Sequence, residues 1–337
     1  MKIVYIGNKL QAKGFTPTSV ETLGNFLISE GYNVKRYSDI RNPFFRFLNM
    51  QFGIFFNNHV NCVIIDTYSS KAFWFAFFSS LSSIITNKKY ILCLRGGNLP
   101  MRLNKNPKLC NWMFSNSFRN ISPSGYLLQE FEKKGYKNLT LIPNTIEIEN
   151  YSFLPRTLSS PKVLWVRSFA EIYNPLLAVD VLIELKKIYP EAELCMVGPE
   201  KDGSLIKVKQ YAADNNVEVS FPGKLSKKEW FKLSENYNIF LNTTNFDNTP
   251  VSVMEAMALG LPVVSTNVSG LPFLIQTDKD GILVEPNNSS LMVQAIDKLV
   301  KDKSLYKKIQ LNARKKAETW DWQVIKNDWN KLLEQLK

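Results

Sequence analysis

The sequence contains few residues of the kinds that build metal centres or disulfide frameworks. Among its 337 residues there is one histidine, His59, and there are four cysteines, none in a CxxC spacing: Cys62, Cys93, Cys110 and Cys195. Three of the cysteines lie in strand-like runs, so we interpret all four as buried, reduced and structural. His59 precedes a predicted strand, at the end that lies away from the ligand edge of a parallel sheet, and a structural role is favoured for it as well.

Long apolar runs are also missing. The longest one, residues 72–85, is shorter than the ~20 residues that a bilayer span needs, and serines interrupt it. We interpret it as a buried crossover helix. The N-terminus enters a strand-like segment without the long apolar region and cleavage site of a signal peptide, so we expect a cytoplasmic protein.

Acidic residues are scarce in the first half of the chain. Residues 1–150 carry 18 Lys+Arg against 8 Asp+Glu, a net charge of +10, whereas the remainder carries 24 against 22. This asymmetry suggests that the first half meets an anionic partner, which leaves a phosphorylated substrate, a lipid surface or a nucleic acid open. A lysine-rich surface that merely keeps the protein soluble is the alternative.

The stretch 41–58, RNPFFRFLNMQFGIFFNN, contains many phenylalanines, Arg41 and Arg46, and no acid. It fits a helix at a lipid headgroup surface, with Phe44, Phe45, Phe47 and Phe52 inserted and the cations near the headgroups. An aromatic stripe at helical spacing is also typical of a core helix, so that alternative remains open.

Strand-like and helical segments alternate along the whole chain. Strands are expected at 3–7, 33–37, 62–66 and 90–94, and again from 162–166 onward, after a turn-rich segment near residue 155. This order predicts an α/β protein with two doubly wound, Rossmann-like parallel-sheet domains, 1–155 and 156–320. Open sheets of this type bind ligands beyond the carboxyl ends of their strands, so we expect a site in a cleft that both domains face.

The stretch DNTPVSVMEAMALGLPVVSTNVSG, residues 247–270, carries two acids around the start of an apolar helix. A strand ends at Thr243, and the helix begins near Thr249 with Pro250 in its first turn, where a missing amide hydrogen costs nothing. The free amides of such a helix start attract phosphate. Glu255 can accept hydrogen bonds from the vicinal hydroxyls of a ribose, and Asp247 can face a sugar.

This stretch resembles the signature of the retaining glycosyltransferases of family 4, also called group 1, which have the GT-B fold. Further similar motifs are KVLWVR (162–167), ELCMVGP (193–199), VSFPGKLS (219–226) and DGILVEPNN (280–288). The segment TWDWQVIKNDW (319–329) resembles the family's last helix, which crosses back to the first domain, so we expect 321–337 to pack there. The first half is similar chiefly at 121–147.

The resemblance implies an activity, roles for particular residues, and no cofactor. The activity is metal-independent transfer of a sugar from a nucleotide-sugar donor to a glycan acceptor, with retention of anomeric configuration. The implied catalytic residues are Asp247, Glu255 and Arg167. The implied donor-binding residues are Gly198, Pro199, Gly223, Lys224, Asn248, Thr249, Pro250, Val251, Tyr173 and Asn174. The acceptor-side residues are expected to be Gly7, Gly14, Arg95, Gly96 and Gly97.

The chain departs from the family pattern at two places. Family members usually have Glu where this chain has Asp247, and the shorter side chain leaves the sugar specificity open. Many members also follow the arginine with a lysine, where this chain has Tyr173 and Asn174; Lys224 is a candidate substitute. Asp278, Lys279 and Asp280 spell a DxD, but they stand in a turn before a strand, so we expect turn chemistry and no metal there.

Two other classes of function remain open. A nucleotide-sugar epimerase or phosphorylase of related fold would share the donor half, and a basic nucleic-acid binder would explain the charge but not the carboxylates. We favour the transferase, with no nucleic-acid partner. The expected acceptor is a lipid-linked precursor of a bacterial polysaccharide or lipopolysaccharide, reached by peripheral docking on an anionic membrane.

Overall fold

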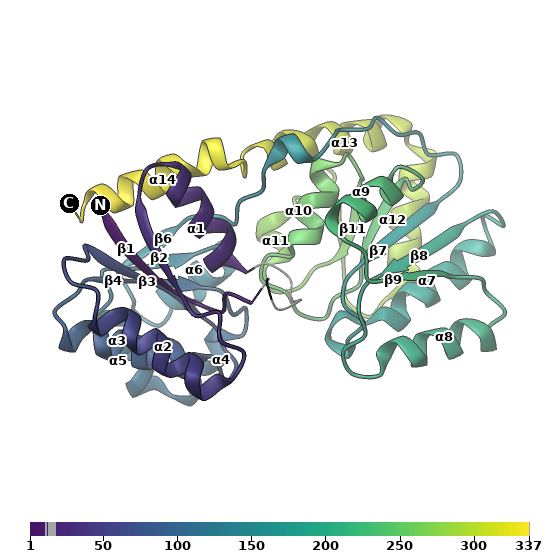
Figure 1. Ribbon diagram of the computed structural model, residues 1–337. Coiled ribbons are helices and arrows are strands. Elements are labelled where there is room, and N and C mark those ends of the chain that lie inside the picture. Colours follow the sequence, from purple (N-terminus) through teal and green to yellow (C-terminus); the bar gives the residue numbers. More distant parts are fainter. Residues whose placement is uncertain (11, 13–17, 337) are drawn as a thin grey trace. The chain divides into compact units, whose positions relative to one another are not determined.

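The computed structural model describes residues 1–10, 12 and 18–336 and divides into two compact units (Figure 1). Unit 1 comprises Met1–Pro143 and Ile325–Lys337, and unit 2 comprises Asn144–Val324. The sequence patterns place this boundary at residue 155. With the structural boundaries, unit 1 carries 21 Lys+Arg against 8 Asp+Glu and unit 2 carries 21 against 22, so the net positive charge belongs to unit 1.

Unit 1 is built on a parallel sheet with the strand order β2-β1-β3-β4-β5-β6. The strands are β1 (Lys2–Ile6), β2 (Asn33–Tyr37), β3 (Cys62–Thr67), β4 (Tyr90–Leu94), β5 (Arg119–Ser122) and β6 (Leu139–Leu141). The central strands β3 and β4 are buried along their whole length, because helices cover both faces of the sheet. The strand order reverses between β1 and β3.

The helices of unit 1 are α1 (Ser19–Ser29), α2 (Pro43–Phe55), α3 (Phe73–Ile85), α4 (Leu99–Lys105), α5 (Pro107–Ser115) and α6 (Gly125–Glu132). In Figure 1, α2, α3 and α5 lie on one face of the sheet and α1 lies on the other. A capping box of Thr18 and Glu21 begins α1, and the Asn42 side chain caps α2. The sequence did not lead us to expect α4 and α5.

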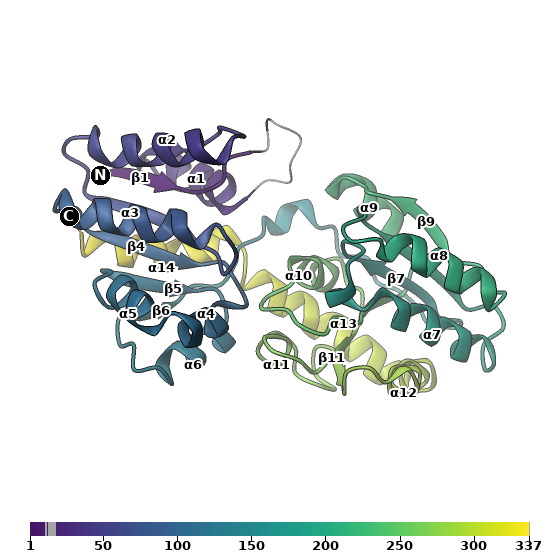
Figure 2. The ribbon, with the colours of Figure 1, turned by 90° about the horizontal axis from the view of Figure 1, so that it is seen from below.

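The last helix, α14 (Trp322–Glu334), leaves unit 2 and joins unit 1. It lies alongside the sheet of unit 1 in both views (Figures 1 and 2). Tyr32 donates a hydrogen bond to Asn330 over 2.8 Å, and Lys326 lies 3.4 Å from the Glu30 carboxylate. Ile325 and Trp329 are buried, so apolar packing fixes this returning helix.

Unit 2 contains a second parallel sheet, with the order β12-β11-β10-β7-β8-β9. Its strands are β7 (Lys162–Val166), β8 (Glu193–Val197), β9 (Ser220–Gly223), β10 (Ile239–Asn242), β11 (Val263–Thr266) and β12 (Ile282–Val284). This is the strand order of a dinucleotide-binding fold, and it reverses between β7 and β10.

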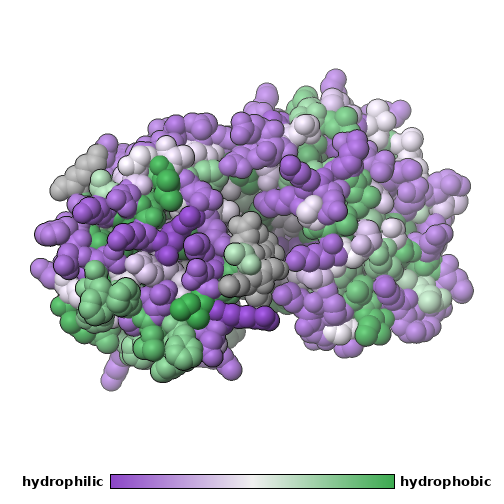
Figure 3. Space-filling view, viewed as in Figure 1, coloured by the Kyte–Doolittle hydropathy of each residue, from purple (hydrophilic) through white to green (hydrophobic). Residues whose placement is uncertain are grey.

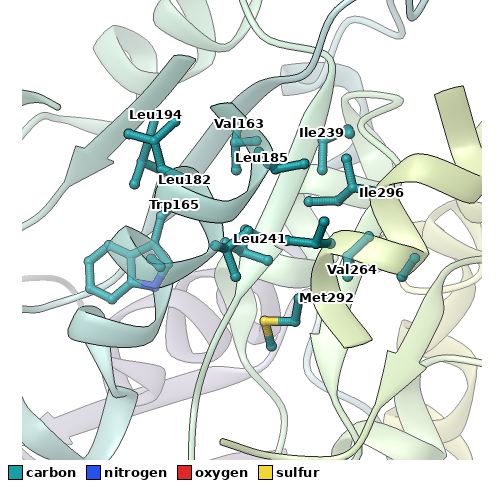
Figure 4. Packing of buried hydrophobic residues seen from close by; sticks show 14 of the residues in the cluster. Val163, Trp165, Leu182, Leu185, Leu194, Ile239, Leu241, Val264, Met292 and Ile296 are labelled. Carbon is teal, nitrogen blue, oxygen red and sulfur yellow. The ribbon is translucent and has the colours of Figure 1, made fainter. Parts of the chain in front are cut away.

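The helices of unit 2 are α7 (Pro175–Lys186), α8 (Ser204–Asp214), α9 (Lys227–Ser234), α10 (Val251–Ala258), α11 (Leu271–Leu274), α12 (Ser289–Lys301) and α13 (Lys303–Glu318). One face of the sheet packs against α7, α8 and α12, and Figure 4 shows this core with Trp165 and Leu241 from the strands facing Leu182 and Met292 from the helices. The opposite face packs against α9, α10 and α11.

Some expectations about single residues can be compared with the structure. All four cysteines are buried, as expected, and none of them is in a disulfide. His59 lies in an exposed turn before β3, with a positive φ of 57°. Among the described residues, no helix is both long and apolar enough to cross a membrane.

Candidate functional site

The charged residues of the signature gather at the carboxyl ends of β7 and β10, where the strand order of unit 2 reverses. Arg167 directly follows β7, and the loop from β10 to α10 carries Asp247. Such a switch point is the place where open α/β sheets bind ligands, because the loops on either side diverge and leave room between them. The geometry of these residues therefore decides what unit 2 can bind.

Arg167 and Asp247 form an ion pair at this switch point. The Arg167 Nη2 donates to Asp247 Oδ2, and the two side chains are 15% and 14% exposed. The guanidinium also stacks on the Tyr173 ring, 4.0 Å from its centroid. Burial raises the pKa of the Asp247 carboxyl, and the positive charge of Arg167 opposes that rise. The buried Arg167 Nε has no hydrogen-bond partner within the described chain, so the guanidinium retains a donor.

The start of α10 has several polar groups without partners in the described part of the chain. Pro250 occupies the N-cap position, and no side chain from the described residues accepts a hydrogen bond from the first amides of the helix. The hydroxyl oxygens of Thr249 and Ser252 are buried there and also lack partners in the described part of the chain. Free amides, two unpaired hydroxyls and the positive end of the helix dipole together favour an oxyanion such as phosphate.

Glu255 lies in the second turn of α10, and its side chain is only 5% exposed. Its Oε1 accepts a hydrogen bond from the Tyr151 hydroxyl over 2.9 Å, and the Lys227 Nζ lies 2.6 Å from the same oxygen. Burial, and secondly the charge of Glu255, raise the pKa of Tyr151 far above its ordinary value. Arg314 binds the backbone of Tyr151: its Nη1 donates hydrogen bonds to the backbone carbonyls of Tyr151 and Ala258.

Two glycines allow the backbone segments of the site to approach each other. A Cβ on Gly198 would lie 1.7 Å from the carbonyl oxygen of Arg167, and a Cβ on Gly270 would lie 1.6 Å from that of Asn248. Gly270 also donates its amide to the Asp247 carbonyl over 2.9 Å. Any other residue at these positions would push the arginine or the acidic loop away.

The other donor-binding residues that the resemblance implies differ in their contacts and in their exposure. Asn174 begins α7 with a left-handed φ of 47° and donates to Asn287 over 2.8 Å. Pro199 accepts the Phe169 amide, and Gly223 accepts the Gly198 amide. Val251 and Lys224 are exposed. Lys224 forms no ion pair with any described residue, so the structure gives it no contact with the two carboxylates.

Sequence reasoning missed three residues of this site. Tyr151 and Lys227 contact Glu255, and Gly270 shapes the acidic loop. A signal existed only for Lys227: the pattern of Ser226 followed by Glu229 is a capping box, which places Lys227 at the first position of a helix. Tyr151 is far from Glu255 along the chain, and no local pattern pairs them.

Two residues that are expected on the acceptor side, Arg95 and Gly7, lie close to a buried acid of β3, Asp66. Arg95 lies with its Nε 3.2 Å from Asp66 Oδ1, and the Tyr5 hydroxyl donates to the same oxygen over 3.0 Å. A Cβ on Gly7 would lie 2.9 Å from Asp66 Oδ2. Arg95 is thus engaged by an internal carboxylate, and its contact with an acceptor stays a prediction.

Of the other glycines in this group, Gly96 lies at a close approach of two backbone segments and Gly97 lies in a turn. A Cβ on Gly96 would lie 2.3 Å from the Ser69 amide nitrogen, and Gly97 stands in the turn before α4. Gly14 lies outside the described residues.

The DxD of residues 278–280 is a turn with both carboxylates occupied. Lys298 pairs with Asp278 over 2.7 Å, and Lys316 pairs with Asp280 over 2.9 Å. Asp278 has a positive φ of 60°, as in a tight turn. Within the described ranges, no three His, Cys, Asp or Glu side chains are grouped so that they could hold a metal ion.

Both units together have the GT-B fold, as comparison with solved structures shows. Sucrose-phosphate synthase from Thermosynechococcus elongatus matches with a TM-score of 0.81 at 14% identity, covering 99% of this chain and 98% of that one. Anabaena HepE in complex with UDP matches with a TM-score of 0.78 at 16% identity, covering 99% and 100%. At such low identity these likenesses establish the fold alone.

Residues 151–316, nearly all of unit 2, match the family described as glycosyl transferases, group 1. A relative in Escherichia coli K12, the putative colanic acid biosynthesis glycosyltransferase WcaL, is 26% identical over 219 residues, covering 61% of this chain and 53% of the relative. The matched segments span about half the length of the first curated relatives, 42% and 53%.

Proposed function

We propose that the protein is a retaining glycosyltransferase that takes a sugar from a nucleotide-sugar donor held by unit 2. The observation that carries this proposal is the uncapped start of α10 beside Arg167, with Asp247 on one side and Glu255 on the other. A nucleotide sugar has a diphosphate between a ribose and a hexose, and these three parts correspond to the helix start, Glu255 and Asp247. UDP in the HepE complex supports the nucleotide part by analogy of fold.

Each residue has a defined task in this proposal. The amides near Thr249 to Val251 hold the diphosphate, and Arg167 neutralises the charge that develops on the leaving phosphate. Asp247 binds hydroxyls of the transferred sugar. The leaving phosphate itself assists removal of the acceptor proton, because the stretch 247–270 offers no histidine and no carboxylate besides Asp247 and Glu255.

A thermal-shift panel of nucleotide sugars tests the donor class. A donor that binds the folded state raises the melting temperature, and the rise grows with the ratio of the donor concentration to its dissociation constant. We expect one or two nucleotide sugars of the panel to stabilise the wild-type protein and to lose that effect in Asp247→Asn. A panel in which no nucleotide and no nucleotide sugar stabilises the protein would contradict the proposal.

For the acceptor, we propose a lipid-linked precursor of a bacterial surface polysaccharide, which unit 1 meets at an anionic membrane. WcaL, named for colanic acid biosynthesis, supports the polysaccharide context. The supporting feature of unit 1 is an exposed aromatic surface on α2 and the residue after it, which comprises Phe44, Phe45, Phe52 and Phe56, between 53% and 70% exposed. Figure 3 shows apolar side chains gathered on the lower part of unit 1, over α2.

Two residues of the expected membrane stretch have other partners. The Arg46 guanidinium donates to the carbonyls of Ile40 and Arg41 and to the Asn8 side chain, so it stabilises the start of α2. Phe47 packs its ring 5.4 Å from that of Phe78 on α3. We therefore assign insertion to the four exposed phenylalanines, and attraction to the excess positive charge of unit 1, at ~1 kcal/mol for each cation near the surface.

Sedimentation with anionic liposomes tests this docking at low and high salt. We expect wild type to sediment at low salt, and a variant with Phe44, Phe45, Phe52 and Phe56 changed to serine to remain in the supernatant. The matched control changes Ile188 and Ile206 to serine, two exposed apolar residues of unit 2 that should not matter. Wild type in the supernatant, or equal sedimentation of the phenylalanine variant, would contradict membrane docking.

A further inference from the structure

The ion pair between Lys227 and Glu255 joins an exposed cation to a buried carboxylate. Their side chains are 59% and 5% exposed. Lys227 is the first residue of α9, where the positive end of the helix dipole disfavours a cation. The helix is already capped, because Ser226 and Glu229 bind each other's backbone amides. The lysine therefore gains its stabilisation from Glu255 and not from its own helix.

Apolar packing holds α9 in place independently of this ion pair. The Tyr151 and Phe231 rings lie 4.7 Å apart, and Trp230 is buried in the same cluster as Met254 and Met257 of α10. The lysine backbone thus has a fixed position near Glu255, while its long stem leaves the ammonium group free to turn toward water.

Two donors share the Glu255 Oε1. They are the Tyr151 hydroxyl at 2.9 Å and the Lys227 ammonium at 2.6 Å. A ribose hydroxyl that binds this same oxygen must displace one of them. The Tyr151 hydroxyl is buried, and removing its acceptor would leave it unsatisfied at considerable cost. The Lys227 side chain is 59% exposed, so its ammonium can exchange the carboxylate for water at little cost.

We infer that Lys227 is a displaceable counter-ion, which neutralises Glu255 while the donor site is empty and yields the carboxylate to the ligand's ribose hydroxyls. This inference rests on the proposed function, because it takes Glu255 as the ribose contact. Lys227 is a positioning residue: it acts through Glu255 and competes with the ligand, whereas a phosphate-binding lysine would add to the affinity.

The competition predicts a dependence on the ribose 2′-hydroxyl that no other role of Lys227 produces. In Lys227→Met the apolar stem remains, but the ammonium no longer occupies Glu255. A ribonucleotide should then bind more tightly, by roughly two- to fivefold, the strength typical of a partly exposed ion pair. A 2′-deoxynucleotide cannot present the diol that replaces the ammonium, so its affinity should not change.

Isothermal titration of the full chain tests this with UDP, ADP and GDP, each against its 2′-deoxy counterpart, for wild type and Lys227→Met. Lys228→Met is the matched control, because Lys228 is the next residue of α9 and is exposed. Thermal unfolding of each variant confirms that it is folded. We expect Lys227→Met to raise the affinity for the ribonucleotide and to leave the affinity for the deoxynucleotide unchanged. Lys228→Met should change neither affinity.

The other outcomes each overturn the inference in a recognisable way. If Lys227→Met binds the ribonucleotide and the deoxynucleotide more weakly by the same factor, the ammonium binds phosphate. If neither affinity changes, the ion pair between Lys227 and Glu255 is only structural. If wild type binds none of the six nucleotides, the proposed function fails and the inference fails with it, whereas binding with the wrong response to Lys227→Met rejects the inference alone.

Discussion

Arg167→Met should destabilise unit 2 by an amount that depends on pH. The substitution removes the partner of Asp247, whose carboxylate is 14% exposed, and the stacking on Tyr173. Breaking a fully buried pair costs 3–5 kcal/mol as a rule, so for this slightly exposed pair we expect a loss of about 2–4 kcal/mol at neutral pH.

The pH dependence follows from the direction of the Asp247 pKa. Burial raises this pKa even in the presence of Arg167, and without the arginine it must rise further. A carboxyl with a raised folded-state pKa destabilises the fold above that pKa, and the penalty disappears as the pH falls toward the unfolded value of ~3.9. The gap between wild type and Arg167→Met should therefore narrow on acidification, by about 1.4 kcal/mol for each unit of additional shift.

Equilibrium urea unfolding at about pH 7 and about pH 4.5, followed by tryptophan fluorescence, measures both effects. Lys162→Met is the matched control, because Lys162 stands at the other end of β7 and pairs over 2.8 Å with Glu193, with side chains 44% and 53% exposed. That exposed pair should contribute less than ~1 kcal/mol, with little pH dependence. If Arg167→Met costs no more than Lys162→Met, or costs the same at both pH values, the buried ion pair is not as described.

Three further predictions concern the site. Glu255→Gln should keep the fold and lower both nucleotide-sugar binding and transfer, which titration and rate measurements check; unchanged kinetics would remove Glu255 from the site. Gly270→Ala should cost roughly 1–3 kcal/mol and lower donor affinity, because its methyl group would enter the space of the Asn248 carbonyl, and wild-type behaviour would show that the loop yields easily. The product should keep the donor's anomeric configuration, and an NMR spectrum of fresh product that shows inversion would refute the retaining mechanism.

The sheets were the most predictable part of the fold. The expected strand 90–94 coincides with β4, and 162–166 coincides with β7, because both are short and mostly apolar, as is typical of strands in a parallel sheet covered on both faces. The helices α4 and α5 were not predicted, and each has a proline near its start, Pro100 and Pro107. Both prolines stand in first helical turns, where proline is tolerated.

The candidate site was predictable only where its residues are close together in the chain. The motif placed Asp247 and Glu255 around the start of α10, and the structure has them there. The partners Tyr151, Lys227 and Gly270 come from other elements, and only tertiary packing brings them to the two acids. The same limit applies to Arg95, whose engagement by Asp66 depends on how β3 pairs with β4.

The most direct test of the proposed function is nucleoside diphosphate release from the donor that the thermal-shift panel selects, with and without an extract of lipid-linked bacterial glycans. We predict that the purified protein releases the nucleoside diphosphate only with the extract, and that an equal amount of sugar enters the lipid fraction. Consumption of the donor without any acceptor, by epimerisation of its sugar or by cleavage with inorganic phosphate, would contradict a transferase and favour an epimerase or phosphorylase of the same fold.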